Sequence, residues 1–128
     1  MIEYREGGDV DIDALAGLRT LCEFAAKDHE FLTQQVAGAR WVVHAYDGAR
    51  LVGFCRAISD GVSNAYISSV MVHPEYRRHG IGREMLARLL GGKGDIKFVL
   101  HTRTAAAAFY AEVGFAPASD MMIRDRRR

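Results

Sequence analysis

The segment from His73 to Gly82, HPEYRRHGIG, limits what this chain can fold into more than any other part of the sequence. An apolar run, AYISSVMV, precedes it, and an amphipathic segment, IGREMLARLL, follows it. This order is that of a strand, a basic loop with two glycines, and a helix. Such a loop leaves backbone N–H groups uncovered, and the start of the helix adds further N–H groups and a partial positive charge. The sequence therefore predicts an anion site, usually one for phosphate.

The loop matches neither of two common nucleotide-binding motifs. Gly80 and Gly82 are not followed by the Gly-Lys-Ser/Thr of a Walker A loop, and no third glycine follows at the spacing of a dinucleotide fingerprint. Arg77, Arg78, His79 and Arg83 add charge or hydrogen-bond donors around the loop. An ordinary tight turn with solvated arginines is the alternative interpretation. The loop by itself does not identify the anion.

Periodicity and turn residues predict a chain in which strands run together first and then alternate with helices. Strands are expected at 2–6, 40–46, 51–58, 64–72 and 96–102, with a last pair at 114–119 and 120–125. Helices are expected at 9–26, 28–37, 81–90 and 105–113, with Asp11 or Asp13 capping the first and Thr104 the last. This order predicts an α/β (α+β) fold, in which about four helices flank one mixed sheet of six to seven strands.

Length, charge and cysteine content narrow the function classes. The 128 residues suit a single domain, 1–128, and a formal net charge of +1 gives no general attraction to nucleic acid or membrane. No run is apolar enough to span a membrane, and residues 1–11 do not resemble a secretory signal. Cys22 and Cys55 lack a metal-ligand spacing, so free thiols and no metal are expected. We expect a cytoplasmic protein with no nucleic-acid or membrane partner.

Two blocks of the sequence resemble the GNAT N-acetyltransferase superfamily. VMVHPEYRRHGIGREML is similar to the family's acyl-coenzyme A signature, Arg/Gln-x-x-Gly-x-Gly/Ala, which reads from Arg77 to Gly82 here with Pro74 upstream. AAAAFYAEVGF resembles the family's later Phe/Leu-Tyr-x-x-x-Gly-Phe, which runs from Phe109 to Phe115. The element order also resembles the family fold, so the likeness extends from the first strand to Phe115.

The resemblance implies an acetyl-coenzyme A (acetyl-CoA) site in a cleft between the strands at 64–72 and 96–102, which splay apart in the family. Backbone groups of the strand at 64–72 pair with the pantetheine arm there, and amides from about Arg78 to Gly82 hold the pyrophosphate. Glycine at 80 and 82 lets the backbone approach without a Cβ atom in the way. The implied coenzyme-binding residues are Val70, Met71, Val72, Arg77, Arg78, His79, Gly80, Ile81, Gly82, Arg83, Arg103 and Phe109.

For the chemistry, the resemblance implies that Tyr110 protonates the leaving sulfur. A phenol with a pKa of about 10 can protonate a thiolate whose acid has a pKa of about 8.5 at modest cost. The alternative role for Tyr110 is packing at the edge of the core. A backbone amide between Val70 and Val72 is implied to polarise the thioester carbonyl.

The sequence departs from the family pattern at two positions. Ser68 stands where many relatives have a glutamate, six residues before the proline, so the general base is not identified. His73, His101 and Glu75 are candidates by residue type, and a chain of water molecules is another. Arg103 stands where many relatives have an asparagine that touches the pantetheine arm.

These inferences predict an acetyl-CoA-dependent N-acetyltransferase that moves an acetyl group directly to a primary amine of a small molecule or peptide. The candidate contacts for a cationic amine are Asp28, His29, Glu30 and Asp60. A catalytically degenerate sensor that binds coenzyme A, or a partner-binding module, is the alternative; Ser68 favours it and Tyr110 argues against it. An edge strand near the C-terminus also suggests a homodimer.

Overall fold

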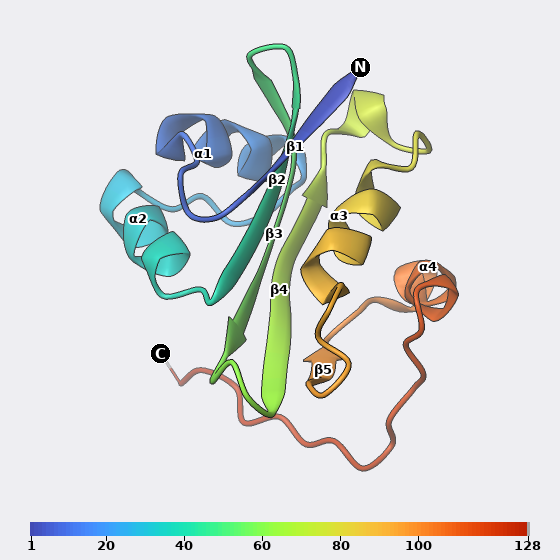
Figure 1. Cartoon of the computed structure of the whole chain (residues 1–128). Helices are drawn as coiled ribbons and strands as arrows, with labels where there is room; N and C mark the ends of the chain where they lie inside the picture. Colours follow the sequence, from blue (N-terminus) through green and yellow to red (C-terminus); the bar gives the residue numbers. More distant parts are fainter. Residues whose placement is uncertain (128) are drawn as a thin grey trace.

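The computed structural model describes residues 1–127, which form one five-stranded sheet in the order β1-β2-β3-β4-β5 (Figure 1). The strands are β1 (Ile2–Glu6), β2 (Trp41–Asp47), β3 (Arg50–Ser59), β4 (Asn64–Val72) and β5 (Lys97–Leu100). The α-helices are α1 (Ile12–Leu21), α2 (His29–Ala37), α3 (Ile81–Leu90) and α4 (Ala107–Glu112), and the 3₁₀ helices are η1 (Pro74–Tyr76) and η2 (Thr104–Ala106). Neighbouring strands are antiparallel except β4 and β5, which are parallel. The mixed sheet with four α-helices confirms the predicted fold class.

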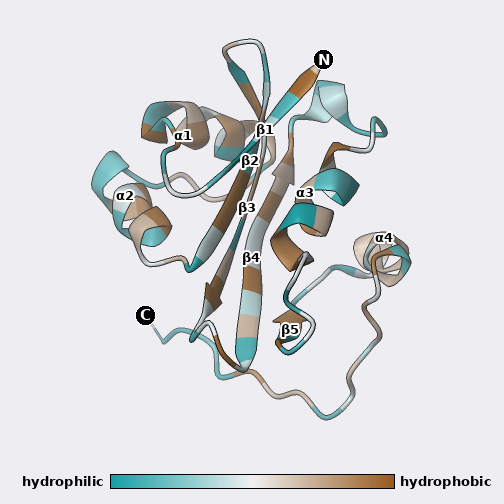
Figure 2. Ribbon diagram, in the orientation of Figure 1, coloured by the Kyte–Doolittle hydropathy of each residue, from teal (hydrophilic) through white to brown (hydrophobic). Residues whose placement is uncertain are grey.

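Helices cover both faces of the sheet, with α1 and α2 on one face and α3 on the other (Figure 1). Leu15 and Leu18 of α1 belong to a core that includes Phe54 of β3. Met85 and Leu86 of α3 belong to the core on the opposite face. Figure 2 shows hydrophobic residues concentrated on the strands between these helical layers. Burial of these apolar side chains on both faces is the main stabilising contribution to the fold.

The first helix is shorter than its hydrophobic pattern predicts. Asp11 caps α1, because its side chain accepts hydrogen bonds from the N–H groups of Asp13 and Ala14, at 2.9 and 3.2 Å. The helix ends at Leu21 and not at residue 26, since Glu23 has a left-handed φ of 64°. The chain after α1 therefore turns back across the end of the helix towards the sheet.

Gly53 allows α3 to lie close to β3. A Cβ atom at this position would stand 2.9 Å from Met85 Sδ and 3.1 Å from Ile81 Cγ2. We expect Gly53→Ala to lower the free energy of unfolding by about 1–3 kcal/mol, because it overpacks the core. Denaturant titration measures this loss. Gly17→Ala is the matched control, because a Cβ atom on exposed Gly17 meets nothing within 4 Å; it should leave stability unchanged or raise it slightly. Equal stability of Gly53→Ala and wild type would contradict this account of the packing.

The two parallel strands pair along only part of their length. The register runs from Asn64 opposite Lys97 to Ile67 opposite Leu100 and then stops, while β4 continues from Ser68 to Val72 without a partner on β5. A register shift between β3 and β4 and a left-handed φ of 64° at Ser69 mark a bulge at the same point. The strands therefore splay apart, as the predicted fold class requires.

The prediction of six to seven strands is wrong within residues 1–127, where the sheet has five. The expected pair at 114–119 and 120–125 is irregular instead. Gly114 turns the chain with a φ of 102°, and Pro117 has no N–H to donate to a ladder. Met121, Met122 and Ile123 are consecutive and all exposed, so this segment lacks the alternation that would bury one face of a strand.

The described residues carry neither a membrane-spanning helix nor a cluster of metal-binding side chains. None of the helices in residues 1–127 is long and apolar enough to cross a membrane. The same residues hold no group of three or more His, Cys, Asp or Glu side chains that is arranged to bind a metal ion. Cys22 and Cys55 are free thiols, and Cys55 is buried.

Candidate active site

A pocket of about 700 Å³ lies at the splayed part of β4, between the start of α3 and α4. This volume lies within the usual range for small-molecule sites, about 300–1,000 Å³. The residues that line it are Cys22, Phe24, Val70, Met71, Val72, Tyr76, Arg77, Arg78, Gly80, Ile81, Gly82, Arg83, Ala106, Phe109 and Tyr110. The two family-like blocks, which are far apart in the sequence, therefore meet around one cavity.

Tyr110 and every expected coenzyme-binding residue line this pocket, except His79 and Arg103. The ring Nδ1 of His79 lies 2.9 Å from the carbonyl oxygen of Arg77 and 3.0 Å from that of Tyr76, so this nitrogen donates to the backbone. Arg103 is exposed in the connection after β5, and its carbonyl oxygen accepts a hydrogen bond from the N–H of Ala106 at 3.0 Å. Both residues support the shape of a loop and do not line the cavity.

Four further residues line the pocket without a signal in the sequence pattern: Cys22, Phe24, Tyr76 and Ala106. Cys22 and Phe24 come from the connection after α1, which turns towards β4. The Tyr76 hydroxyl donates to a carboxylate oxygen of Asp47, so its phenol is fixed from outside the pocket. Tyr76 adjoins the predicted loop in the sequence, whereas Cys22 and Phe24 reach the cavity only through the tertiary fold.

The loop before α3 has the backbone shape of an anion site. Arg78 and Gly80 both have left-handed φ angles, of 68° and 79°, and α3 begins directly afterwards. Left-handed residues in such turns form concave nests of backbone N–H groups, and the N-terminus of the helix adds to their positive potential. Gly82 sits in the first turn of α3, where a Cβ atom would stand 3.2 Å from Phe109 Cζ. Glycine therefore allows Phe109 of α4 to close over the start of α3.

The free part of β4 contributes backbone polar groups to the pocket. The carbonyl oxygen of Val72 accepts hydrogen bonds from Cys22 Sγ at 3.3 Å and from Arg77 Nε at 3.2 Å. These two side chains occupy a position that a neighbouring strand would otherwise fill. An extended ligand that is rich in amide groups suits such an edge, because it can pair with the exposed backbone as a strand does.

Tyr110 lies at the boundary between the pocket and the core. Its ring packs edge-on against Phe109 and Phe115, with centroid distances of 5.1 and 6.0 Å. Burial raises the pKa of Tyr110 above its usual value of 10.0, and the nearby Cys55 raises it further. The phenol therefore stays protonated at neutral pH, as a proton donor must.

The candidate bases lie outside the pocket. Buried His73 accepts a hydrogen bond at Nδ1 from the N–H of Glu75 at 3.1 Å, and thereby caps η1. The Glu75 carboxylate is exposed and lies 3.9 Å from Arg50. His101 is exposed after the end of β5. In the described part of the chain, the residues that line the pocket include no carboxylate and no histidine.

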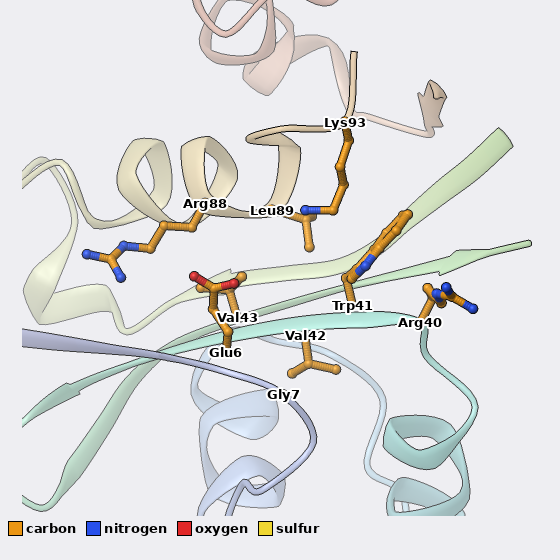
Figure 3. Close-up of a pocket in the computed structure, with 9 residues that line it drawn as sticks. All are labelled: Glu6, Gly7, Arg40, Trp41, Val42, Val43, Arg88, Leu89 and Lys93. Carbon is orange, nitrogen blue, oxygen red and sulfur yellow. The ribbon is translucent and has the colours of Figure 1, made fainter. Parts of the chain in front are cut away.

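A second pocket lies nearer the β1 edge of the sheet, where β1 and β2 meet α3 (Figure 3). Its volume is only about 80 Å³. Lys93 is one of the residues that line it, with its Nζ atom 4.9 Å from the centroid of the Trp41 ring (Figure 3). This pocket is too small for a substrate and is remote from the glycine loop.

Comparisons with known proteins show the family of this chain. The family model "Acetyltransferase (GNAT) domain" matches residues 37–117, which include the glycine loop and Tyr110. Serotonin N-acetyltransferase 2 of Oryza sativa is 32% identical over 120 residues, which cover 88% of this chain and 60% of that protein. GCN5-related N-acetyltransferase 1 of Arabidopsis thaliana is 29% identical over 117 residues, covering 87% of this chain and 59% of the relative. The chain thus spans about 60% of the length of these two relatives.

Solved structures show the same fold at lower identity. A GNAT-family acetyltransferase of Streptococcus pneumoniae matches with a TM-score of 0.80 and 23% identity, covering 99% of this chain and all of that one (100%). The ribosomal-protein-S18-alanine N-acetyltransferase of Escherichia coli matches with a TM-score of 0.75 and 18% identity, covering 93% of this chain and 80% of that one. With the family model matching most of the sequence, from strand β2 to beyond Phe115, the chain belongs to the GNAT acetyltransferase family.

Proposed function

We propose that the protein is an acetyl-CoA-dependent N-acetyltransferase that acts on a primary amine of a small molecule or peptide by direct transfer. One observation carries this proposal. The nest before α3, the free edge of β4 and Tyr110 all line a single pocket. A pyrophosphate suits the nest, and the amide groups of a pantetheine arm suit the strand edge. These residues therefore fit acetyl-CoA as co-substrate, although His79 and Arg103 do not line the pocket.

In this proposal the protein orients the thioester. It donates one proton to the departing thiolate, and the amine loses another proton. Backbone N–H groups near the bulge of β4 stabilise negative charge on the carbonyl oxygen. Tyr110 holds a proton for the departing thiolate, and its raised pKa keeps that proton in place at neutral pH. Because the described pocket offers no carboxylate or histidine, water carries the proton away from the amine.

A second candidate function is a sensor that binds coenzyme A without catalysis. The observation that favours it is the pocket lining, which lacks a carboxylate or histidine base within residues 1–127. Thermal-shift measurements with acetyl-CoA, ATP and NAD, joined to a free-thiol release assay over a panel of amines, separate the two functions. We expect acetyl-CoA alone to raise the melting temperature, and some amine to give thiol release. Binding of acetyl-CoA with no acetylation across the panel would favour the sensor, and no binding would contradict both.

The pH dependence tests the route of the amine proton. An aliphatic amine has a pKa of about 10.4 and an α-amino group about 8, so the neutral fraction of either rises with pH. We expect kcat/KM to rise across about pH 7–9, following the ionisation of the acceptor. The raised pKa of Tyr110 means that loss of its proton does not lower the rate in this range.

Two histidine variants serve as controls for this profile. His73→Gln and His101→Gln should each leave the rise in place, because neither side chain lines the pocket. Both variants are compared with wild type on the same acceptor, whose own pKa is known. A profile that levels off near the histidine pKa of about 6.5, and loses that inflection in one variant, would instead identify a histidine base.

A further inference from the structure

Two buried arginines lie beside the bulge of β4, on the face of the sheet that α1 and α2 cover. Arg19 of α1 is 5% exposed and Arg56 of β3 is 7% exposed. Arg56 stands opposite Ser68 in the antiparallel register of β3 and β4. Its Nη2 lies 3.3 Å from Ser68 Oγ, and its Nε lies 3.4 Å from Ser69 Oγ. The serine at 68, where many family members have a carboxylate, is therefore in contact with a buried cation.

Within residues 1–127, few donors of these two guanidinium groups contact an acceptor of the protein. Each guanidinium has five N–H donors, but Arg56 makes two long contacts, both to neutral hydroxyl groups. Arg19 donates from Nη2 to the carbonyl oxygen of Ala25 at 2.8 Å. Its Nε is buried without a hydrogen-bond partner in residues 1–127. Neither arginine forms an ion pair with a carboxylate in that part of the chain.

This arrangement is costly unless an anion completes it. A buried charge loses its hydration, and the loss is normally offset by a counter-charge and by hydrogen bonds. Burial lowers the pKa of Arg56, and repulsion from Arg19 lowers it further. Burial also lowers the pKa of Arg19. Arginine nevertheless stays charged at neutral pH, so two positive charges lie near one another, and the side-chain contacts of Arg56 are to neutral hydroxyl groups.

Neither arginine lines the pocket itself, but both have neighbours that do, at the end where the resemblance places the acetyl group. Ser68 and Ser69 directly precede Val70, which lines the pocket. Phe24 also lines the pocket, and the guanidinium carbon of Arg19 lies 5.3 Å from the centroid of its ring. By contrast, the carboxylate of Asp60, a candidate contact for a cationic amine, accepts hydrogen bonds from the N–H groups of Val62 and Ser63.

We propose that the acceptor amine carries a carboxylate, which binds to Arg56 with the help of Ser68 and Ser69 in the positive field of Arg19. The inference rests on the proposed function and narrows its substrate to an amino acid or a related amino-carboxylate. The planar fork of a guanidinium matches a carboxylate with two parallel hydrogen bonds. The substrate then supplies the negative charge that the chain lacks at position 68.

The first experiment compares amines that differ only in this charge. The panel pairs amino acids with their carboxamides, for example glycine with glycinamide and β-alanine with its amide, at equal concentrations of neutral amine. The kcat/KM ratio from free-thiol release should favour the acid by about tenfold or more in the preferred pair, as expected for a charge-assisted contact. Equal or better use of the amide throughout the panel would overturn the inference. Ethanolamine phosphate is included, and a preference for it over every carboxylate would overturn the assignment to a carboxylate.

The second experiment removes the cation. Arg56→Gln should raise KM for the preferred acid about tenfold or more, while KM for its amide and for acetyl-CoA changes less than about twofold. Arg56→Lys keeps the positive charge but loses the planar guanidinium. Its KM for the acid should therefore lie between the values of wild type and Arg56→Gln. Arg40→Gln makes the same change at an exposed arginine outside the pocket and should match wild type. An unchanged ratio of acid to amide in Arg56→Gln would overturn the inference.

A binding measurement separates this inference from the proposed function and does not depend on a variant folding. N-acetylated amino acids and their amides are each added to wild-type protein with coenzyme A, and the melting temperature is recorded. The acids should raise it more than the amides do. If the acids raise the melting temperature more than the amides do and no amine is acetylated, the carboxylate site is supported and the enzymatic proposal fails. If amines are acetylated but the acids stabilise no better than the amides, the carboxylate site fails alone.

Discussion

Gly82→Glu is expected to weaken acetyl-CoA binding by at least about a hundredfold, while the protein stays folded. The new side chain starts 3.2 Å from Phe109 Cζ in the first turn of α3, where the loop nest would hold the pyrophosphate. The new side chain places a carboxylate next to the negatively charged pyrophosphate, and it fills the space that glycine leaves open. A loss of about 2.7 kcal/mol of binding free energy corresponds to a hundredfold change, and burial of like charges reaches this size. Isothermal titration with acetyl-CoA measures the effect directly.

Gly94→Glu is the matched control for this variant. It makes the same chemical change at an exposed glycine where a new Cβ atom meets nothing within 4 Å. We expect it to bind acetyl-CoA as wild type does, and both variants to keep a cooperative unfolding transition. Wild-type affinity in Gly82→Glu would show that the loop before α3 does not hold the coenzyme.

Tyr110→Phe is expected to lower kcat for acetyl transfer by about ten- to a thousandfold, the range for loss of one general acid. Acetyl-CoA affinity should change little, because the ring still packs against Phe109 and Phe115. The variant removes only the hydroxyl group, which the raised pKa of Tyr110 keeps protonated at neutral pH. Pre-steady-state thiol release isolates the chemical step, so that slow product release does not hide the loss.

Tyr4→Phe tests whether any lost tyrosine hydroxyl has this effect. Tyr4 is partly buried on β1, outside the pocket, with the Arg88 guanidinium 4.7 Å from its ring centroid. This variant should turn over at the wild-type rate. If Tyr110→Phe also does so, then Tyr110 is a packing residue and the thiolate leaves without its help.

The elements nearest the pocket were predictable because their ends are marked in the sequence. The expected ranges 64–72 and 81–90 match β4 and α3 as the structure has them. Pro74 ends the strand pattern, and Gly91 follows the last apolar residue of the helix. The strand at 96–102 was predicted too long, since β5 ends at Leu100, where its pairing with β4 stops. The expected N-cap of the last helix was also wrong, since α4 begins at Ala107 with Ala106 in the N-cap position, and Thr104 lies inside η2.

Residues that reach the pocket by tertiary contact could not be predicted. Cys22 contacts the carbonyl of Val72, which is 50 positions away, and nothing in the local pattern of either residue indicates the other. The same limit applies to Arg56, which lies inside the apolar run LVGFCRAI. Such a run predicts a buried strand but does not reveal what faces a charge within it. Only the register with Ser68 shows that its nearest partners are hydroxyl groups.

The early end of pairing between β4 and β5 also bears on aggregation. A strand with free backbone groups is a template for a strand of another molecule, and proteins normally cover or distort such edges. Here the free edge lies inside a cleft, and the side chains of Cys22 and Arg77 already occupy the carbonyl oxygen of Val72. The fold thus covers part of this edge with its own side chains, which limits pairing with a strand of another protein molecule.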